Sequence, residues 1–228
     1  MGRLKNSVSM MCADIVNLKS ALDLFAAKGV DYLHIDIMDG HYVPNFTLGP
    51  DYCARLNAYS QIPLDIHLMI ENVDAFIPTF SKAADSLISF HPETSYHPLR
   101  TINLIRNSGC RPGIAVDPAM PLQSIEPMLE NVDFVLVMTV SPGYAGQKLI
   151  PQTLDKVAQL KKLLKERGLP CMIEIDGNVS WENLPKMIRA GGDIFVTGTS
   201  SVFQKELGLE EALDRLGKVF AECEGETS

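Results

Sequence analysis

Three short segments of the chain place ionisable side chains at every second position. Successive side chains of a β-strand point to opposite faces, so each set projects to one side of its strand while the intervening aliphatic residues project to the other. The aligned residues are His34, Asp36 and Met38 in the first segment, Asp65, His67 and Met69 in the second, and Glu174 and Asp176 in the third. Such stripes could bind a cation or move protons.

Two imidazoles and two carboxylates from these segments form a candidate metal site. Burial removes ionisable groups from water, which is costly unless they are paired, hydrogen-bonded or bound to a cation. The four residues concerned are His34, Asp36, His67 and Asp176. A mixed set of nitrogen and oxygen donors suits one divalent ion, and the spacing leaves Zn²⁺, Mn²⁺, Fe²⁺ and Co²⁺ equally open. Each residue alone could be a satisfied polar group at a strand end, but their concurrence favours the metal.

Two loops rich in small residues are candidates for binding an anion. One spans residues 139–147 and contains Gly143 and Gly146, and the other contains Gly198 and Thr199. Small residues let backbone N–H groups approach an anion, and a helix N-terminus adds a favourable dipole. Both sequences are also ordinary turns or helix caps, so their positions after neighbouring strands are what favours a phosphate site.

Methionines and two further histidines complete the candidates. Met38, Met69 and Met138 fall near strand ends and could line a pocket around a flat, electron-rich intermediate, although residue type alone favours core packing. His91 is expected to reach the rim of that pocket, and His97 to lie on a helix surface.

The elements that must position these residues alternate along the whole chain. Short β-branched segments are followed by segments of helical period, which is typical of βα units feeding a parallel sheet. The expected strands are residues 8–11, 32–37, 64–68, 86–90, 113–116, 134–138, 172–175 and 194–197, and the clearest helix is 153–167.

Eight such units in 228 residues predict an α/β fold, a single (β/α)8 TIM barrel over residues 1–228. Residues 222–228 are expected to form a frayed tail. A doubly wound open sheet is the alternative, and it is disfavoured because no G-x-G-x-x-G or P-loop sequence follows the first strand.

Composition limits the partners. The formal net charge of −8 argues against binding nucleic acid or anionic lipid, so an anionic ligand must be held by local geometry. No signal peptide is expected, and no segment approaches the roughly 20 apolar residues of a membrane span. Five widely spaced cysteines without a C-x-x-C pair indicate reduced thiols and a cytoplasmic location.

Four ordered motifs carry a resemblance to a known family. They are HIDIMDGHYVPN at residues 34–45, LDIHLM at 64–69, VMTVSPGYAGQ at 137–147 and IDG at 175–177. With them the chain resembles the ribulose-phosphate 3-epimerase family from about residue 9 to residue 203. The resemblance implies a (β/α)8 barrel, one divalent metal ion, a small sugar phosphate as substrate and a homo-oligomer.

The resemblance also implies roles for single residues. Asp36 and Asp176 would be the acid and base that invert C3 of a 2-ketose phosphate through a cis-enediolate, and with His34 and His67 they would hold the metal. The implied substrate contacts are Ser9, His67, Met38, Met69 and Met138, with phosphate at Gly143, Tyr144, Ala145, Gly146, Gly177, Gly198 and Thr199.

The sequence leaves two substrates open. Val8, Cys12, Ala145 and Asn178 depart from the commonest family pattern. The segments 9–12, 91–94 and 145–147 are more similar to the D-allulose-6-phosphate 3-epimerase branch, so both that hexulose and D-ribulose 5-phosphate stay open.

Two other functions remain as alternatives. One is a catalytically silent barrel that binds a sugar phosphate and holds a structural metal. The other is a metal-free aldose–ketose isomerase of the triose-phosphate type, which leaves the inward His-x-Asp stripe unexplained.

Overall fold

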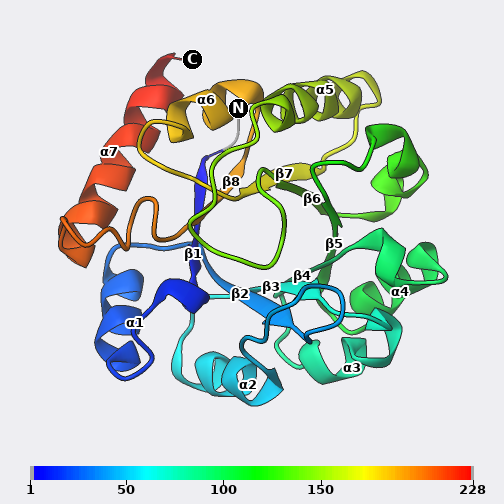
Figure 1. Ribbon diagram of the computed structural model, residues 1–228, viewed down its shortest axis with the longest axis horizontal. Helices are drawn as coiled ribbons and strands as arrows, with labels where there is room; N and C mark the ends of the chain where they lie inside the picture. Colours follow the sequence, from blue (N-terminus) through cyan, green and yellow to red (C-terminus); the bar gives the residue numbers. More distant parts are fainter. Residues whose placement is uncertain (1–2, 227–228) are drawn as a thin grey trace.

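A computed structural model of the protein describes residues 3–226, which form a closed barrel of eight parallel strands surrounded by helices (Figure 1). Each strand pairs with its two sequence neighbours, and β8 closes the barrel against β1. The predicted single (β/α)8 barrel is therefore confirmed, and the open doubly wound sheet is excluded. The strands are β1 (Lys5–Ser9), β2 (Tyr32–Met38), β3 (Leu64–Met69), β4 (Leu87–Phe90), β5 (Arg111–Val116), β6 (Phe134–Met138), β7 (Met172–Asp176) and β8 (Ile194–Thr197).

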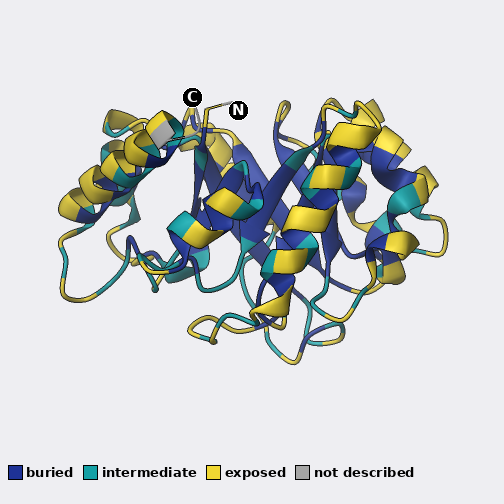
Figure 2. Cartoon of the chain, turned by 90° about the horizontal axis from the view of Figure 1, so that it is seen from above, coloured by how far each residue is buried: buried dark blue, intermediate teal, exposed yellow. Residues whose placement is uncertain are grey.

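Helices cover the outside of the barrel, with buried residues facing the strands and exposed residues facing outward (Figure 2). After β5, short 3₁₀ turns stand where the other units have an α-helix. The α-helices are α1 (Leu18–Ala27), α2 (Pro50–Tyr59), α3 (Ile77–Phe80), α4 (Pro98–Asn107), α5 (Gln152–Glu166), α6 (Leu184–Ala190) and α7 (Leu209–Glu226). The 3₁₀ turns are η1 (Met10–Cys12), η2 (Val73–Ala75), η3 (Pro92–Thr94), η4 (Leu122–Ser124) and η5 (Glu126–Asn131).

The first strand differs from its predicted range. It was expected at residues 8–11, but β1 spans Lys5–Ser9 and the chain turns into η1 directly after it. Two polar residues of β1 hydrogen-bond to buried partners on other strands: Thr197 Oγ1 donates to Asn6 Oδ1 at 2.7 Å, and Ser7 Oγ donates to Asp65 Oδ2 inside the barrel at 2.6 Å. A strand whose buried residues include polar groups bonded to distant segments shows no apolar pattern in sequence, which explains the error.

The other predicted strands and the clearest helix match or shift by a residue or two, and the C-terminus differs more. Helix α5 begins at Gln152 and ends at Glu166, close to the predicted 153–167. Helix α7 continues to Glu226 and buries Leu213 and Leu216, so residues 222–226 are helical where a frayed tail was expected. The last two residues of that expected tail, 227–228, lie outside the described part of the chain.

Strand register decides which side chains meet inside the barrel. Between β2 and β3, His34 pairs with Asp65 and Asp36 pairs with His67. The intervening isoleucines and leucines of these strands pack outward in the large apolar core beneath the helices. The polar stripes predicted from the two-residue period therefore lie side by side within the barrel.

The long loop after β6 crosses the centre of the barrel when the molecule is viewed as in Figure 1. It covers the carboxyl ends of the strands, where the active sites of (β/α)8 enzymes are built. Among the described residues, no helix combines the length and apolarity needed to cross a bilayer.

Candidate active site

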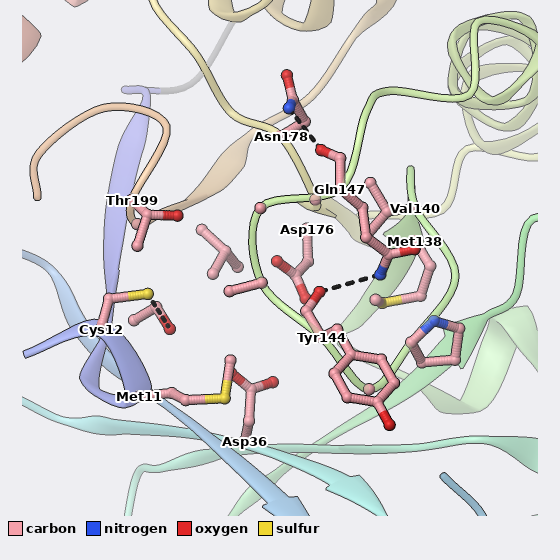
Figure 3. Close-up of a pocket in the computed structure, with 18 of the residues that line it drawn as sticks. Met11, Cys12, Asp36, Met138, Val140, Tyr144, Gln147, Asp176, Asn178 and Thr199 are labelled. Carbon is pink, nitrogen blue, oxygen red and sulfur yellow. Dashed lines mark hydrogen bonds between the residues drawn. The ribbon is translucent and has the colours of Figure 1, made fainter. Parts of the chain in front are cut away.

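A cavity of about 580 Å³, a volume that includes its open mouth, lies at the carboxyl ends of the strands (Figure 3). It brings together residues from opposite sides of the barrel, with Asp36 of β2 and Asp176 of β7 both pointing into it. The predicted site residues in its lining are Ser9, Asp36, Met38, Met69, Met138, Gly143, Tyr144, Ala145, Gly146, Asp176, Gly177, Gly198 and Thr199. His34 and His67 are fully buried and do not belong to the lining.

The four predicted metal ligands meet at the floor of this cavity. One donor atom from each of His34, Asp36, His67 and Asp176 lies within 4.8 Å of all the others. Asp36 Oδ1 is 3.3 Å from His34 Nε2 and 3.3 Å from His67 Nδ1. Two imidazoles and two carboxylates at this spacing could hold one divalent metal ion.

Each of the two imidazoles is also held by its second ring nitrogen. His34 Nδ1 is 2.6 Å from Asp65 Oδ2, and His67 Nε2 is 3.0 Å from His91 Nε2. The nitrogens left facing Asp36 are therefore Nε2 of His34 and Nδ1 of His67. Metal-binding histidines characteristically have the second nitrogen fixed in this way, so the residues present fit a metal ion.

The two aspartates differ in their affinity for a proton. Withdrawal from water, followed by the negative charge of Asp36, raises the pKa of Asp176 to about 7. Burial also acts to raise the pKa of Asp36, but the charges and hydrogen bonds of His34 and His67 hold it well below its usual range. Paired carboxylates with pKa values pushed apart are suited to opposite acid and base roles.

The histidines respond to the same charges. Burial acts to lower the pKa of His34, but the carboxylates of Asp65 and Asp36 outweigh it and raise the pKa well above its ordinary value. Burial dominates at His67 and lowers its pKa. Without a metal ion, His34 therefore carries the positive charge that balances the buried carboxylates.

A second polar layer lies below the predicted ligands. Asp65 and Glu174 are fully buried, and together with His34 they form another close group of donor atoms. Burial and the neighbouring Asp65 raise the pKa of Glu174 well above its usual range, so it is a neutral acid in the barrel interior. The sequence pattern predicted that both residues point inward but assigned them no function.

The glycines of the loop after β6 and of the turn after β7 have conformations that other residues rarely adopt. Gly143 and Gly177 both have φ of 113°, and a Cβ atom at Gly177 would lie 2.7 Å from Val140 Cγ2. The segment after β2 anchors the crossing loop, because Asn45 Nδ2 donates to Gly143 O at 2.8 Å and Tyr144 OH donates to Pro44 O at 2.8 Å.

Several lining residues were not predicted as site residues. Cys12 and Asn178 were noted only as departures from the family pattern, and Met11 and Gln147 had no assigned role, yet all four line the cavity (Figure 3). Asn178 Nδ2 donates to Gln147 O at 2.6 Å and joins the turn after β7 to the crossing loop. The position of Asn178 shortly after a predicted strand was the sequence signal that could have identified it as a site residue.

The two remaining candidate histidines lie in different environments. His91 was expected at the rim of the pocket, but it is fully buried, because it packs against His67 with the two Nε2 atoms 3.0 Å apart. His97 is exposed and immediately precedes α4, near the predicted helix surface.

Comparison with known proteins agrees with this geometry. The ribulose-phosphate 3-epimerase family model matches residues 5–203. The chain is 46% identical over 199 residues to ribulose-phosphate 3-epimerase 1 of Cupriavidus necator, covering 86% of this chain and 82% of the relative. It is 39% identical over 214 residues to ribulose-phosphate 3-epimerase of Escherichia coli (strain K12), covering 92% and 95%.

Solved structures with little sequence identity share the fold. Phosphoribosyl anthranilate isomerase from Thermococcus kodakaraensis superposes with a TM-score of 0.64 at 14% identity, covering 95% of this chain and 98% of that one. That likeness concerns the barrel alone. The family match over most of the chain and the identity to the curated relatives are more specific, and the protein is a carbohydrate epimerase that belongs to the ribulose-phosphate 3-epimerase family.

Proposed function

We propose that the protein is a metal-dependent 3-epimerase that inverts C3 of a 2-ketose phosphate by proton transfer between Asp36, Asp176 and the substrate. The observation that carries this proposal is the pair of carboxylates, from β2 and β7 on opposite sides of the barrel, that point into one cavity. One of the two aspartates takes the C3 proton from one face, and the other donates a proton to the opposite face. Their protonation states are then exchanged, which suits the reverse reaction.

Proton removal next to a carbonyl needs stabilisation of the resulting cis-enediolate. One divalent ion, whether Zn²⁺, Mn²⁺, Fe²⁺ or Co²⁺, held by His34, Asp36, His67 and Asp176, would supply this by offsetting negative charge on the C2 and C3 oxygens. The lining side chains Met38, Met69 and Met138 place apolar groups around the reacting carbons and exclude water.

The phosphate is proposed to bind the backbone of three loops. Gly143–Gly146, Gly177 and Gly198–Thr199 line the end of the cavity formed by the late strands. No lysine or arginine is among the described lining residues. Backbone N–H groups, rather than side-chain cations, would therefore hold the anion, which is consistent with a chain of net charge −8.

D-ribulose 5-phosphate is the proposed substrate, because relatives that match most of the chain are named ribulose-phosphate 3-epimerases. D-allulose 6-phosphate is the second candidate, because Cys12, Ala145 and Asn178, which depart from the common pattern, all line the cavity. A cytoplasmic homo-oligomer that acts on a small sugar phosphate completes the proposal.

Proton NMR in D₂O tests the reaction. The purified protein is incubated separately with each sugar phosphate, before and after chelation and after adding metal back. Deuterium entering C3 together with the epimer, lost with the metal and restored by it, supports the proposal, and the faster sugar identifies the substrate. Binding without exchange by metal-loaded protein would favour the silent barrel, and exchange that ignores the chelator would refute the metal's role.

Single substitutions test the two-base step in the same assay. Asp36→Asn and Asp176→Asn should abolish epimerisation, because each removes a proton-transferring carboxylate. Asp51→Asn, an exposed substitution on α2 outside the cavity lining, is the matched control. Near-normal turnover by either active-site variant would rule out the two-base mechanism.

A further inference from the structure

His91 contacts the proposed metal site from outside its set of ligands. It follows β4, is fully buried, and places Nε2 3.0 Å from Nε2 of His67. The two rings lie with centroids 5.2 Å apart at an interplanar angle of 35°. Neither the proposed proton transfers nor the ligand set uses His91, although this contact reaches a ligand directly.

Two neutral ring nitrogens at hydrogen-bond distance share one hydrogen, which allows two arrangements. In the first, His67 Nε2–H donates to His91 Nε2, and His67 keeps a lone pair on Nδ1. In the second, His91 donates, and the hydrogen of His67 moves to Nδ1, which lies 3.3 Å from Asp36 Oδ1. Only the first arrangement leaves His67 able to bind a cation from the side that faces Asp36.

Glu93 distinguishes between these arrangements. The Nδ1 atom of His91 is buried without a hydrogen-bond partner in the described part of the chain, and Glu93 Oε1 lies 3.7 Å from it. A carboxylate attracts an N–H group at this position and repels a lone pair. The hydrogen of His91 is therefore favoured on Nδ1, which leaves Nε2 free to accept from His67.

Tyr42 holds this carboxylate and covers the imidazole. Its hydroxyl donates to Glu93 Oε1 at 2.8 Å. Its ring stacks on His91 with centroids 4.7 Å apart and an interplanar angle of 38°. The segment after β2 and the segment after β4 thus enclose His91 and restrict its orientation.

We propose that His91 and Glu93 are positioning residues for His67. Glu93 places the hydrogen of His91 on Nδ1, and His91 Nε2 then accepts from His67 Nε2–H, so that the His67 Nδ1 lone pair faces the metal. The inference rests on the proposed metal-dependent function. It gives His67 a partner equivalent to Asp65, which holds Nδ1 of His34 at 2.6 Å.

The affinity of the protein for a metal ion tests this positioning role separately from catalysis. Zn²⁺ binding is measured by competition with a chelator for the wild type, His91→Phe, His91→Gln and Glu93→Gln. Loss of the partner of a ligating histidine characteristically weakens metal affinity by about 10- to 100-fold, and we expect this for His91→Phe, which has no acceptor for His67. His91→Gln should bind more tightly than His91→Phe, because the amide oxygen can accept the same hydrogen bond. Glu93→Gln should show a smaller loss, because its side chain is 39% exposed.

His97→Phe is the matched control, since it removes an exposed histidine outside the site and should leave the affinity unchanged. A folded His91→Phe variant that binds Zn²⁺ as tightly as the wild type would overturn the positioning role while leaving the metal site intact. A wild-type protein that binds no stoichiometric metal would instead overturn the proposed metal site, and this inference with it.

The wild-type protein alone provides a second test that needs no variant to fold. Two-bond ¹H–¹⁵N correlations of the Zn²⁺-loaded protein report which nitrogen of each of the five histidines carries the hydrogen. Hydrogen on Nε2 of His67 and on Nδ1 of His91 supports the proposal. Hydrogen on Nδ1 of His67 would refute it.

Discussion

Binding of a divalent metal ion should release protons in a way that depends on pH near neutrality. Metal ligands bind in their deprotonated forms, so any proton held by a ligand in the metal-free protein must leave. Asp176, with a pKa raised to about 7 by burial and then by Asp36, holds such a proton. His34 holds another, because Asp65 and Asp36 outweigh burial and raise its pKa well above the ordinary value. Asp36 and His67, whose pKa values are lowered, should bind the metal ion without releasing a proton.

The size of the effect follows from the pKa of Asp176. With a pKa of about 7, this carboxyl group carries about 0.9 of a proton at pH 6 and about 0.1 at pH 8. Zn²⁺ binding should therefore release at least about 0.8 proton more at pH 6 than at pH 8, since His34 can only add to the difference. Affinity for the metal should fall correspondingly as the solution becomes more acidic.

Metal affinity should fall as the solution becomes more acidic, whereas the stability of the metal-free protein should rise. The unfolded chain loses this proton near the ordinary pKa of 3.8, whereas the folded protein holds it until about pH 7. The folded state therefore binds more protons between these values, and Asp176 contributes stability that is present below about pH 4 and lost as the pH rises through 7. In thermal denaturation without metal, the Tm of the wild type should fall more between pH 5 and pH 8 than the Tm of Asp176→Asn.

Isothermal titration calorimetry measures the released protons directly. Zn²⁺ is titrated into metal-free protein at pH 6 and pH 8, in buffers of different ionisation enthalpy, and the dependence of the heat on the buffer gives the number of protons. Asp176→Asn should lose the part of the pH difference that belongs to this residue, and Asp51→Asn should retain it. Equal proton release at both pH values in the wild type would refute the assignment of a proton to Asp176.

Three further substitutions probe the loops and the scaffold. Ala145→Leu places a bulky side chain in the cavity lining and should raise KM for the sugar phosphate more than it lowers kcat in steady-state assays; an unchanged KM would argue against phosphate binding there. Gly177→Ala would place a side chain at a φ of 113° with its Cβ atom 2.7 Å from Val140 Cγ2. We therefore expect the free energy of unfolding to fall by about 1–3 kcal/mol, and calorimetry should show a lower Tm. The ammonium group of Lys156 donates to the backbone carbonyls of residues 117, 118 and 120 at 2.9, 2.8 and 2.7 Å. Lys156→Met removes these three hydrogen bonds, and urea unfolding should show that the free energy of unfolding falls by about 1–3 kcal/mol.

Much of the fold was accessible from local pattern. Seven strands were placed to within a residue or two, because their apolar residues recur with the short period of a strand between helical segments. The first strand was misplaced because Asn6 and Ser7 are buried polar residues whose partners, Thr197 and Asp65, are far away in sequence. No local pattern contains those pairings.

The candidate site divides in the same way. Alternation along β2 and β3 was sufficient to predict that His34, Asp36 and His67 share the barrel interior, because side-chain direction along a strand is a local property. The contact of His91 with His67 was not accessible from the sequence, because it depends on the turn after β4 and on the register between two strands. Sequence spacing predicted a rim position for a residue that is fully buried.

The sequence by itself determined the residue types of the site, the strands that carry them and the family to which the chain belongs. The tertiary structure alone decided how these groups act on one another. Asp36 and Asp176 are 140 positions apart, yet barrel closure places both on one cavity and lets the charge of one raise the proton affinity of the other. Burial, charge and hydrogen-bond partners arise only when distant segments meet, and they determine the proton affinity of each carboxylate and which imidazole nitrogens face Asp36.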